Sequence, residues 1–218
     1  MLGTAAFLAI RSSHASNQAP ITDLLDQARA LLTDLHAPEL TPFLKEWPVA
    51  SERRTVPASS VPVLSWLPNI QRSAPAFSAP LVNTLVGATA SLAWRRSYSP
   101  AAVGAQFYEN YAWTEFAGLT GPMPSKRLAC GVLLLGPNVT YPPHRHEADE
   151  IYVPLAGTAA WMHGNDGWRE RLPGSVIHNG SYVPHAMQTG QEPLLALYLW
   201  RSENLAQQSR LDPAPGSG

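Results

Sequence analysis

Short apolar or alternating runs, separated by glycine, proline and asparagine, fill the second half of this 218-residue chain. From about residue 106 the runs are Tyr111–Phe116, Leu128–Leu135, Glu150–Leu155, Thr158–Met162, Ser175–His178 and Leu194–Trp200. Turn sequences lie between them, such as Gly-Asn-Asp-Gly at 164–167 and Pro-Gly at 173–174. Many short strands at close spacing favour a β-sandwich or a barrel. A closed sheet also suits a chain with only 14% charged residues, because charged side chains commonly protect free sheet edges.

The first half of the chain has a helical pattern followed by a proline-rich segment. Between residues 22 and 47, apolar residues recur at three- and four-residue steps, which predicts a helix that ends near Pro38. Pro42 is expected to open a second, short helix. Residues 55–80 contain interleaved apolar residues, including Trp66, and we expect an ordered coil lying on the body. Residues 80–94 fit a further helix.

Composition and charge exclude several classes of partner. Lys and Arg total 15 and Asp and Glu total 16, so the net charge of −1 lacks the basic field that nucleic acids or anionic membranes require. The single cysteine, Cys130, excludes an intramolecular disulfide and a zinc site built from thiolates. We expect Cys130, in an apolar run, to be buried and inert.

Targeting and membrane signals are weak. Residues 1–10 are mostly apolar, but no basic region precedes them, so we expect an N-terminal helix or a misplaced start rather than a secretory signal. No apolar run approaches the ~18 residues that cross a bilayer. The sequence therefore favours a cytoplasmic protein that acts on a small molecule, and it leaves a homodimer open.

Histidines are concentrated in one window. Five of the seven lie between residues 144 and 185: His144, His146, His163, His178 and His185. Residues two apart share a face of a strand, so His144 and His146 point the same way. Glu150 and Tyr152 join them if a turn at 147–149 separates two paired strands. Such a mixed nitrogen and oxygen set on one side of a hairpin suits Zn, Fe, Mn, Ni or Cu.

The spacing His-x-His-x3-Glu-x6-Gly, at 144, 146, 150 and 157, resembles the first metal motif of the cupin superfamily. The preceding Gly136 lies eight positions before the first histidine, where the motif usually has six. The second cupin motif is matched in spacing from Gly174 to His185 and Thr189, with three residue types changed; His178 is the alternative to His185. The resemblance implies a mainly-β cupin barrel, a double-stranded β-helix or jelly roll, over 106–202. An α-helical and proline-rich N-terminal extension would occupy 1–105 and a tail 203–218.

A closer resemblance rests on three segments: Tyr141 to Tyr152, Val183 to Gly190, and Glu192 to Arg201. They are similar to the cupin-type dimethylsulfoniopropionate (DMSP) lyases of the L and Q kinds, in which a metal and tyrosines cleave DMSP to dimethyl sulfide and acrylate. The implied ligands are His146, Glu150 and His185, with His144 in or beside the shell. Tyr152 and Tyr141 are the implied base candidates, and Trp200 matches a pocket tryptophan.

The residues fit a β-elimination. It needs a base, a means of stabilising the charge on the substrate carboxylate, and a pocket for a sulfonium cation. A metal acts on the carboxylate as a Lewis acid, and an adjacent dication lowers the pKa of a phenol. A sulfonium accepts no hydrogen bond, so aromatic faces are its natural partners, at about 0.5–2 kcal/mol each. Trp200 and Tyr198 are the expected substrate contacts, together with His144.

Two other functions stay open. The chain is also consistent with another metal-dependent cupin enzyme, a dioxygenase or an isomerase. An oxygenase would need an open face on redox-active iron and no tyrosine beside the metal. A non-catalytic small-molecule-binding cupin would leave the pair Tyr141 and Tyr152 unexplained.

Overall fold

The computed structural model describes residues 19–49 and 53–212, so the expectation for residues 1–10 lies outside the described part of the chain. The α-helices are α2 (Ala19–Asp34), α3 (Thr41–Lys45), α4 (Leu67–Ser73), α5 (Ala79–Ala88), α6 (Pro100–Val103) and α7 (Ala105–Glu109). The 3-10 helices are η1 (Pro38–Leu40), η2 (Pro62–Trp66) and η3 (Thr89–Ser91). The strands are β1 (Tyr111–Gly118), β2 (Met123–Pro124), β3 (Leu128–Leu135), β4 (Thr140–Arg145), β5 (Asp149–Ala156), β6 (Ala159–His163), β7 (Trp168–Arg171), β8 (Ile177–Asn179), β9 (His185–Thr189), β10 (Leu194–Arg201) and β11 (Arg210–Leu211).

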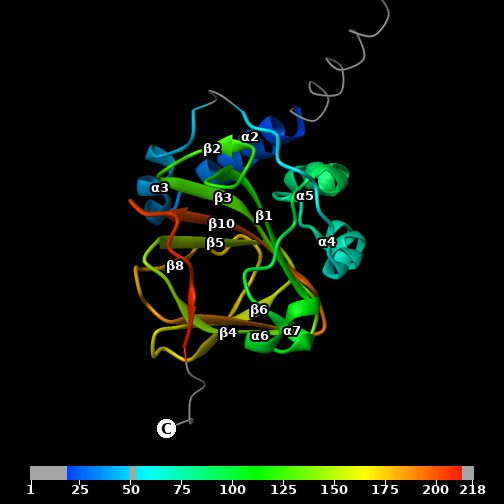
Figure 1. Cartoon of the computed structure of the whole chain (residues 1–218), viewed down its shortest axis with the longest axis vertical. Helices are drawn as coiled ribbons and strands as arrows, with labels where there is room; N and C mark the ends of the chain where they lie inside the picture. Colours follow the sequence, from blue (N-terminus) through cyan, green and yellow to red (C-terminus); the bar gives the residue numbers. More distant parts are fainter. Residues whose placement is uncertain (1–18, 50–52, 213–218) are drawn as a thin grey trace, which may run out of the picture.

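Two mainly antiparallel sheets face each other. The first has the strand order β2-β1-β3-β10-β5-β8 and the second has the order β11-β4-β9-β6-β7 (Figure 1). The helices of the N-terminal region precede both sheets. This arrangement confirms the predicted fold class, a mainly-β cupin barrel with a helical N-terminal region. The domain limits placed at 105 and 202 stay predictions.

The first sheet is buried on both faces, and this explains its continuous apolar runs. All eight residues of β3 are buried. Val132 and Leu134 belong to a cluster with the helices outside the barrel, whereas Leu133 and Leu135 belong to a second cluster between the sheets. Burial on both faces removes the alternation of polar and apolar residues that marks a half-exposed strand.

The N-terminal region agrees with the sequence pattern in part. Helix α2 lies where the apolar spacing predicted a helix, and α3 follows in place of the second, short one. The expectation of a coil over 55–80 was wrong, because η2 and α4 lie within it. Prolines stand at the first turns of both, where the missing N–H costs no hydrogen bond. Helix α5 ends at Ala88 and η3 at Ser91, short of the predicted residue 94.

The predicted hairpin between the histidines and Glu150 was wrong. Strand β4 pairs with β9 and β11 in the second sheet, whereas β5 pairs with β10 and β8 in the first. The connection at 146–148 therefore passes from one sheet to the other. His144 and Glu150 face each other across the barrel rather than along one ribbon, which brings ligands from both sheets to one place.

No helix within residues 19–49 and 53–212 has the length and apolar character needed to span a bilayer. After β10 the chain crosses from the first sheet to the second and pairs with β4 through β11 (Figure 1, red segment). We call residues 203–212 the C-terminal strap.

Candidate metal centre and cavity

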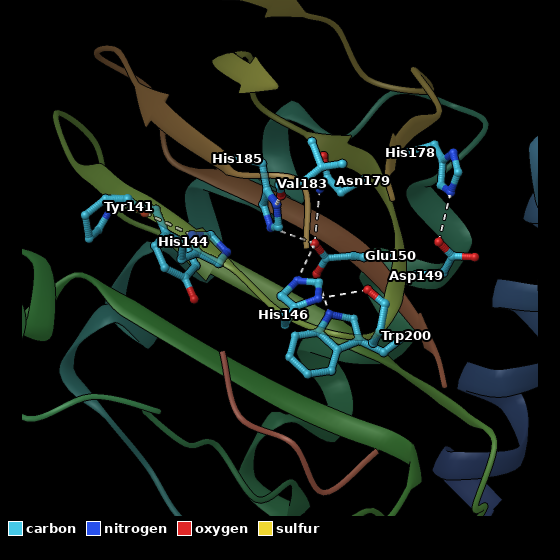
Figure 2. Close-up of polar contacts among 12 residues, drawn as sticks. Tyr141, His144, His146, Asp149, Glu150, His178, Asn179, Val183, His185 and Trp200 are labelled. Carbon is cyan, nitrogen blue, oxygen red and sulfur yellow. Dashed lines mark hydrogen bonds and ion pairs between the residues drawn. The ribbon is translucent and has the colours of Figure 1, made fainter. Parts of the chain in front are cut away.

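Three histidines meet inside the barrel. His144, His146 and His185 are buried, and one ring nitrogen from each lies within 4.8 Å of the others (Figure 2). His144 on β4 pairs in register with His185 on β9, and His146 directly follows β4. The antiparallel pairing of β4 with β9 therefore builds most of the cluster, although its two paired histidines are 41 residues apart in the sequence.

Backbone carbonyls orient all three rings. Nδ1 of His144, His146 and His185 each lies 2.9 Å from a carbonyl oxygen, that of Pro142, Ala148 and Val183 respectively. A carbonyl only accepts a hydrogen bond, so Nδ1 carries a proton, and in the neutral ring Nε2 keeps its lone pair. Fixing the tautomer through the far nitrogen is how proteins prepare histidine ligands for a metal.

Glu150 approaches the same point from the opposite sheet. Its Oε2 lies 3.2 Å from Nε2 of His146 and 3.0 Å from Nε2 of His185. Two ligand atoms that each lie about 2.1 Å from one cation are roughly 3.0–3.4 Å apart. The donor set of three imidazoles and one carboxylate therefore fits a divalent transition metal.

Burial and mutual charge shift the pKa values of these groups. Burial and the neighbouring His185 hold the pKa of His144 well below its ordinary value, so this ring is neutral. Burial alone would raise the pKa of Glu150, but His146 and His185 hold it well below its ordinary value. Burial alone would lower the pKa of His146, but the charge of Glu150 raises it above its ordinary value. Histidine binds a metal through a neutral imidazole, so a bound cation would take the place of any proton on Nε2 of His146.

Neighbours in the first sheet hold the carboxylate of Glu150. Asn179 on β8 and Trp200 on β10 flank it in register. The Asn179 amide donates to Oε2 at 3.1 Å, and the Trp200 indole N–H donates to Oε1. Asn179 was missed by sequence reasoning, because only the pairing of β5 with β8 reveals it.

The two other histidines of the window lie away from this centre. His178 is exposed and its Nε2 lies 3.6 Å from Oδ1 of Asp149 (Figure 2). In the pairing of β8 with β5 its partner is Ile151, which belongs to the cluster formed with the helices outside the barrel. His163 is 44% exposed. Of the two candidates for the last histidine, the structure brings His185 to the cluster and leaves His178 on the outside.

A cavity of about 780 Å³ lies beside the histidines. Its walls include five tyrosines and two tryptophans: Tyr98, Tyr111, Tyr141, Tyr152, Tyr198, Trp113 and Trp200. Polar and aromatic side chains of β1, β5 and β10 supply one wall and the C-terminal strap supplies another. A concave space of this size next to a buried ligand cluster is the expected form of a small-molecule site.

Tyr141 reaches the cavity because of a β-bulge. The pairing of β4 with β9 shifts by one residue between Tyr141 and His144, so residues three apart face the same interior. The Tyr141 ring stacks on His144, with centroids 4.1 Å apart and planes 12° apart. Its hydroxyl lies 3.1 Å from the hydroxyl of Tyr98, a residue that sequence reasoning missed. Burial raises the pKa of Tyr141 well above its ordinary value.

Tyr152 and Tyr198 are direct partners across β5 and β10. Burial and the charge of Glu150 raise the pKa of Tyr152 well above its ordinary value, so positive charge nearby is needed to ionise it at neutral pH. Tyr198 fits because Gly131 lies beside it: a Cβ at Gly131 would come within 2.8 Å of the Tyr198 hydroxyl. Trp200 lies between the cavity and the histidines, with its ring centroid 4.2 Å from that of His146.

The comparisons with known proteins agree with these observations. The model of the dimethylsulfoniopropionate lyase family matches residues 40–196. The dimethylsulfoniopropionate lyase DddQ of Ruegeria pomeroyi is 35% identical over 121 residues, which cover 56% of this chain and 60% of DddQ. The putative lyase DddL of Cereibacter sphaeroides is 36% identical over 111 residues, 50% of this chain and 45% of DddL. The alignments thus span less than two thirds of either curated relative.

Solved structures extend the likeness to most of the chain. The crystal structure of DMSP lyase DddQ from Ruegeria pomeroyi DSS-3 superposes with a TM-score of 0.78 at 28% identity, covering 91% of this chain and 99% of that one. A chain from the crystal structures of the DMSP lyases RdDddP and RnDddQII gives 0.80 at 32% identity, covering 90% and 100%. With the family model matching more than half of its residues, this chain belongs to the dimethylsulfoniopropionate lyase family.

Proposed function

We propose that this protein is a metal-dependent DMSP lyase, a carbon–sulfur lyase that releases dimethyl sulfide and acrylate by base-catalysed β-elimination. One observation supports this most strongly. Three buried imidazoles gather beside a cavity lined by tyrosines, and two of them, those of His146 and His185, present Nε2 to the buried carboxylate of Glu150, in a chain of the DMSP lyase family.

The proposed ligands are His144, His146, Glu150 and His185. A divalent cation held by them, Zn, Fe, Mn, Ni or Cu, supplies positive charge that stabilises the substrate carboxylate and a nearby phenolate. The chain supplies the orientation: three backbone carbonyls fix the imidazoles, while Asn179 and Trp200 fix the carboxylate of Glu150.

Tyr152 on β5 and Tyr141 on β4 are the proposed proton acceptors, and both line the cavity. The proton on the carbon next to the carboxylate moves to the oxygen of a tyrosine in its phenolate form, which becomes a neutral phenol. The electron pair of that C–H bond forms the double bond of acrylate, and the electrons of the C–S bond leave with sulfur as neutral dimethyl sulfide. The step balances without an oxidant or a reductant.

The aromatic walls are proposed to hold the sulfonium. Trp200 and Tyr198 face the interior from one strand, and Trp113 adds a third aromatic ring from β1. Such faces attract a cation that cannot accept a hydrogen bond, by about 0.5–2 kcal/mol each. His144 lies next to the cavity wall, because Tyr141, which lines the cavity, stacks on its ring.

The test is turnover of DMSP by protein loaded separately with each of the five metals. We expect dimethyl sulfide in the headspace and an equal amount of acrylate in solution, without oxygen consumption. Stripping the metal with a chelator should abolish both products, and adding it back should restore them. A protein with one metal per chain that forms neither product would contradict the proposal, and oxygen uptake with iron would favour a dioxygenase instead.

A further inference from the structure

The C-terminal strap forms part of the cavity wall. Five of its residues line the cavity: Leu205, Ala206, Gln207, Gln208 and Ser209. Burial alternates along residues 205–211. The half-buried residues are Leu205, Gln207, Ser209 and Leu211, and the exposed ones are Ala206, Gln208 and Arg210. A turn at 204–207, closed by the hydrogen bond from the Gln207 N–H to the Asn204 carbonyl oxygen at 3.2 Å, places Leu205 and Ala206 against the cavity, and the residues after it lead to β11.

Contacts at both ends and in the middle hold the strap in place. At the start, the guanidinium of Arg127 donates to Glu203. In the middle, the side chains of Tyr182 and Gln207 exchange hydrogen bonds, at 3.3 and 3.1 Å. At the end, Leu211 pairs with His144 in the β11–β4 ladder, and Asp212 accepts from Nε of Arg145 at 2.7 Å. The strap is therefore a fixed wall beside a metal-ligand candidate.

The inward side chains of the strap carry no charge. The amide of Gln207 is engaged by Tyr182. Ser209 lies near Tyr98, whose pKa is raised by burial. Of the strap residues that line the cavity, Leu205 is the large apolar one, and it packs against the cluster between the sheets. Trp113 and Trp200 pack against the same cluster.

We propose that the strap is a size-selective wall of the cavity and that Leu205 limits the alkyl groups that a bound sulfonium can carry. This inference rests on the proposed function. A sulfonium offers only carbon and hydrogen to the wall beside it, so an uncharged wall recognises it by shape. One methylene in an apolar pocket changes discrimination by about 10–200-fold.

The experiment compares dimethyl- with diethylsulfoniopropionate in metal-loaded, full-length protein. We expect Leu205→Ala to raise the diethyl-to-dimethyl ratio of kcat/KM about tenfold and Leu205→Phe to lower it. Asn204→Ala, next to it on the exposed side of the strap, is the control and should leave the ratio unchanged. Unchanged ratios in both Leu205 variants, with metal content and circular dichroism like wild type, would overturn the inference.

A binding measurement separates this inference from the proposed function. Dimethyl- and diethylsulfonioacetate carry sulfur on the carbon next to the carboxylate and cannot undergo the elimination. Their dissociation constants, from calorimetry, should show the same change of ratio in the Leu205 variants. Normal turnover of DMSP with unchanged ratios in the Leu205 variants would contradict only the proposed role of the strap. Changed binding ratios without turnover would contradict only the proposed lyase function. No binding of either compound would contradict both proposals.

Discussion

Trp200 donates its indole N–H to Oε1 of Glu150, so the aromatic side chain expected to hold substrate also fixes the carboxylate that faces the histidines. Its ring lies against His146 on the other side, with centroids 4.2 Å apart. Since Trp200 and Glu150 are partners in the β10–β5 ladder, this contact follows from strand register. Trp200 thus has a positioning role in addition to its place in the cavity wall.

Trp200→Phe keeps an aromatic ring but removes the hydrogen bond to Glu150. Because outer partners of metal ligands commonly contribute 10–100-fold to metal affinity, we expect the dissociation constant of the metal to rise by about that factor. Competition with a chelator of known affinity measures it. Trp168→Phe, on the exposed strand β7, is the matched control. Equal metal affinity in wild type and Trp200→Phe would show that Glu150 needs no partner at Oε1.

His185→Ala should remove most of the metal that the protein retains after purification, because it deletes one of three nitrogens within 4.8 Å of one another. His178→Ala should retain the metal, since His178 is exposed and pairs with Asp149. Elemental analysis of both variants, purified in parallel, measures the metal per chain. Full metal content in His185→Ala would exclude His185 from the ligand set.

Tyr152→Phe and Tyr141→Phe separate the two base candidates. Loss of the general base should lower kcat by about 10²–10⁴-fold while metal content stays near wild type. Tyr108→Phe, whose ring lies under the guanidinium of Arg96 outside the cavity lining, is the control. Turnover that survives in both single variants and in the double variant would mean that neither phenol accepts the proton.

The sequence motif predicted which histidines come together, but it did not predict the strand pairing that brings them together. His144 and His146 do lie on one side, but the assumption of a hairpin placed β4 beside β5, and the structure puts them in opposite sheets. Alternation would also turn Tyr141 and His144 to opposite faces, and only the bulge over Pro142 and Pro143 brings them together. Pairing of distant strands decides such features, and single-sequence periodicity does not encode it.

The helical segment at 67–73 shows the same limit. The prolines and serines of residues 55–80 suggested coil, yet the burial of Leu67 and Ile70 against the outer face of the first sheet stabilises a short helix. A weak local helix propensity is overridden when the apolar side of a segment is buried against another part of the protein. The expectation for Cys130 was confirmed: it is buried, and burial raises the pKa of its thiol.

Gly131→Ala should destabilise the barrel. A Cβ there would lie 2.1 Å from the carbonyl oxygen of Thr114 and 2.8 Å from the Tyr198 hydroxyl, so β1 and Tyr198 must both shift. We expect a loss of about 1–3 kcal/mol in the free energy of unfolding, measured by urea denaturation. Gly190→Ala is the control, because its Cβ would meet nothing within 4 Å. A Gly131→Ala variant as stable as the control would mean that the strands separate at little cost.

Glu115→Gln should change how stability depends on pH. Burial raises the pKa of Glu115, even though its Oε1 accepts hydrogen bonds from the backbone N–H groups of Thr120 and Gly121, both at 2.6 Å. A carboxyl whose pKa is higher in the folded state stabilises the fold below its ordinary value of 4.5, and this contribution is lost as the pH rises through the folded value. The variant lacks that titration. Its free energy of unfolding should therefore fall less than that of wild type between pH 4.5 and pH 7, measured by urea denaturation at several pH values. Glu192→Gln, on an exposed turn, is the control. If the difference between wild type and Glu115→Gln stays constant over this range, burial of Glu115 does not govern its ionisation.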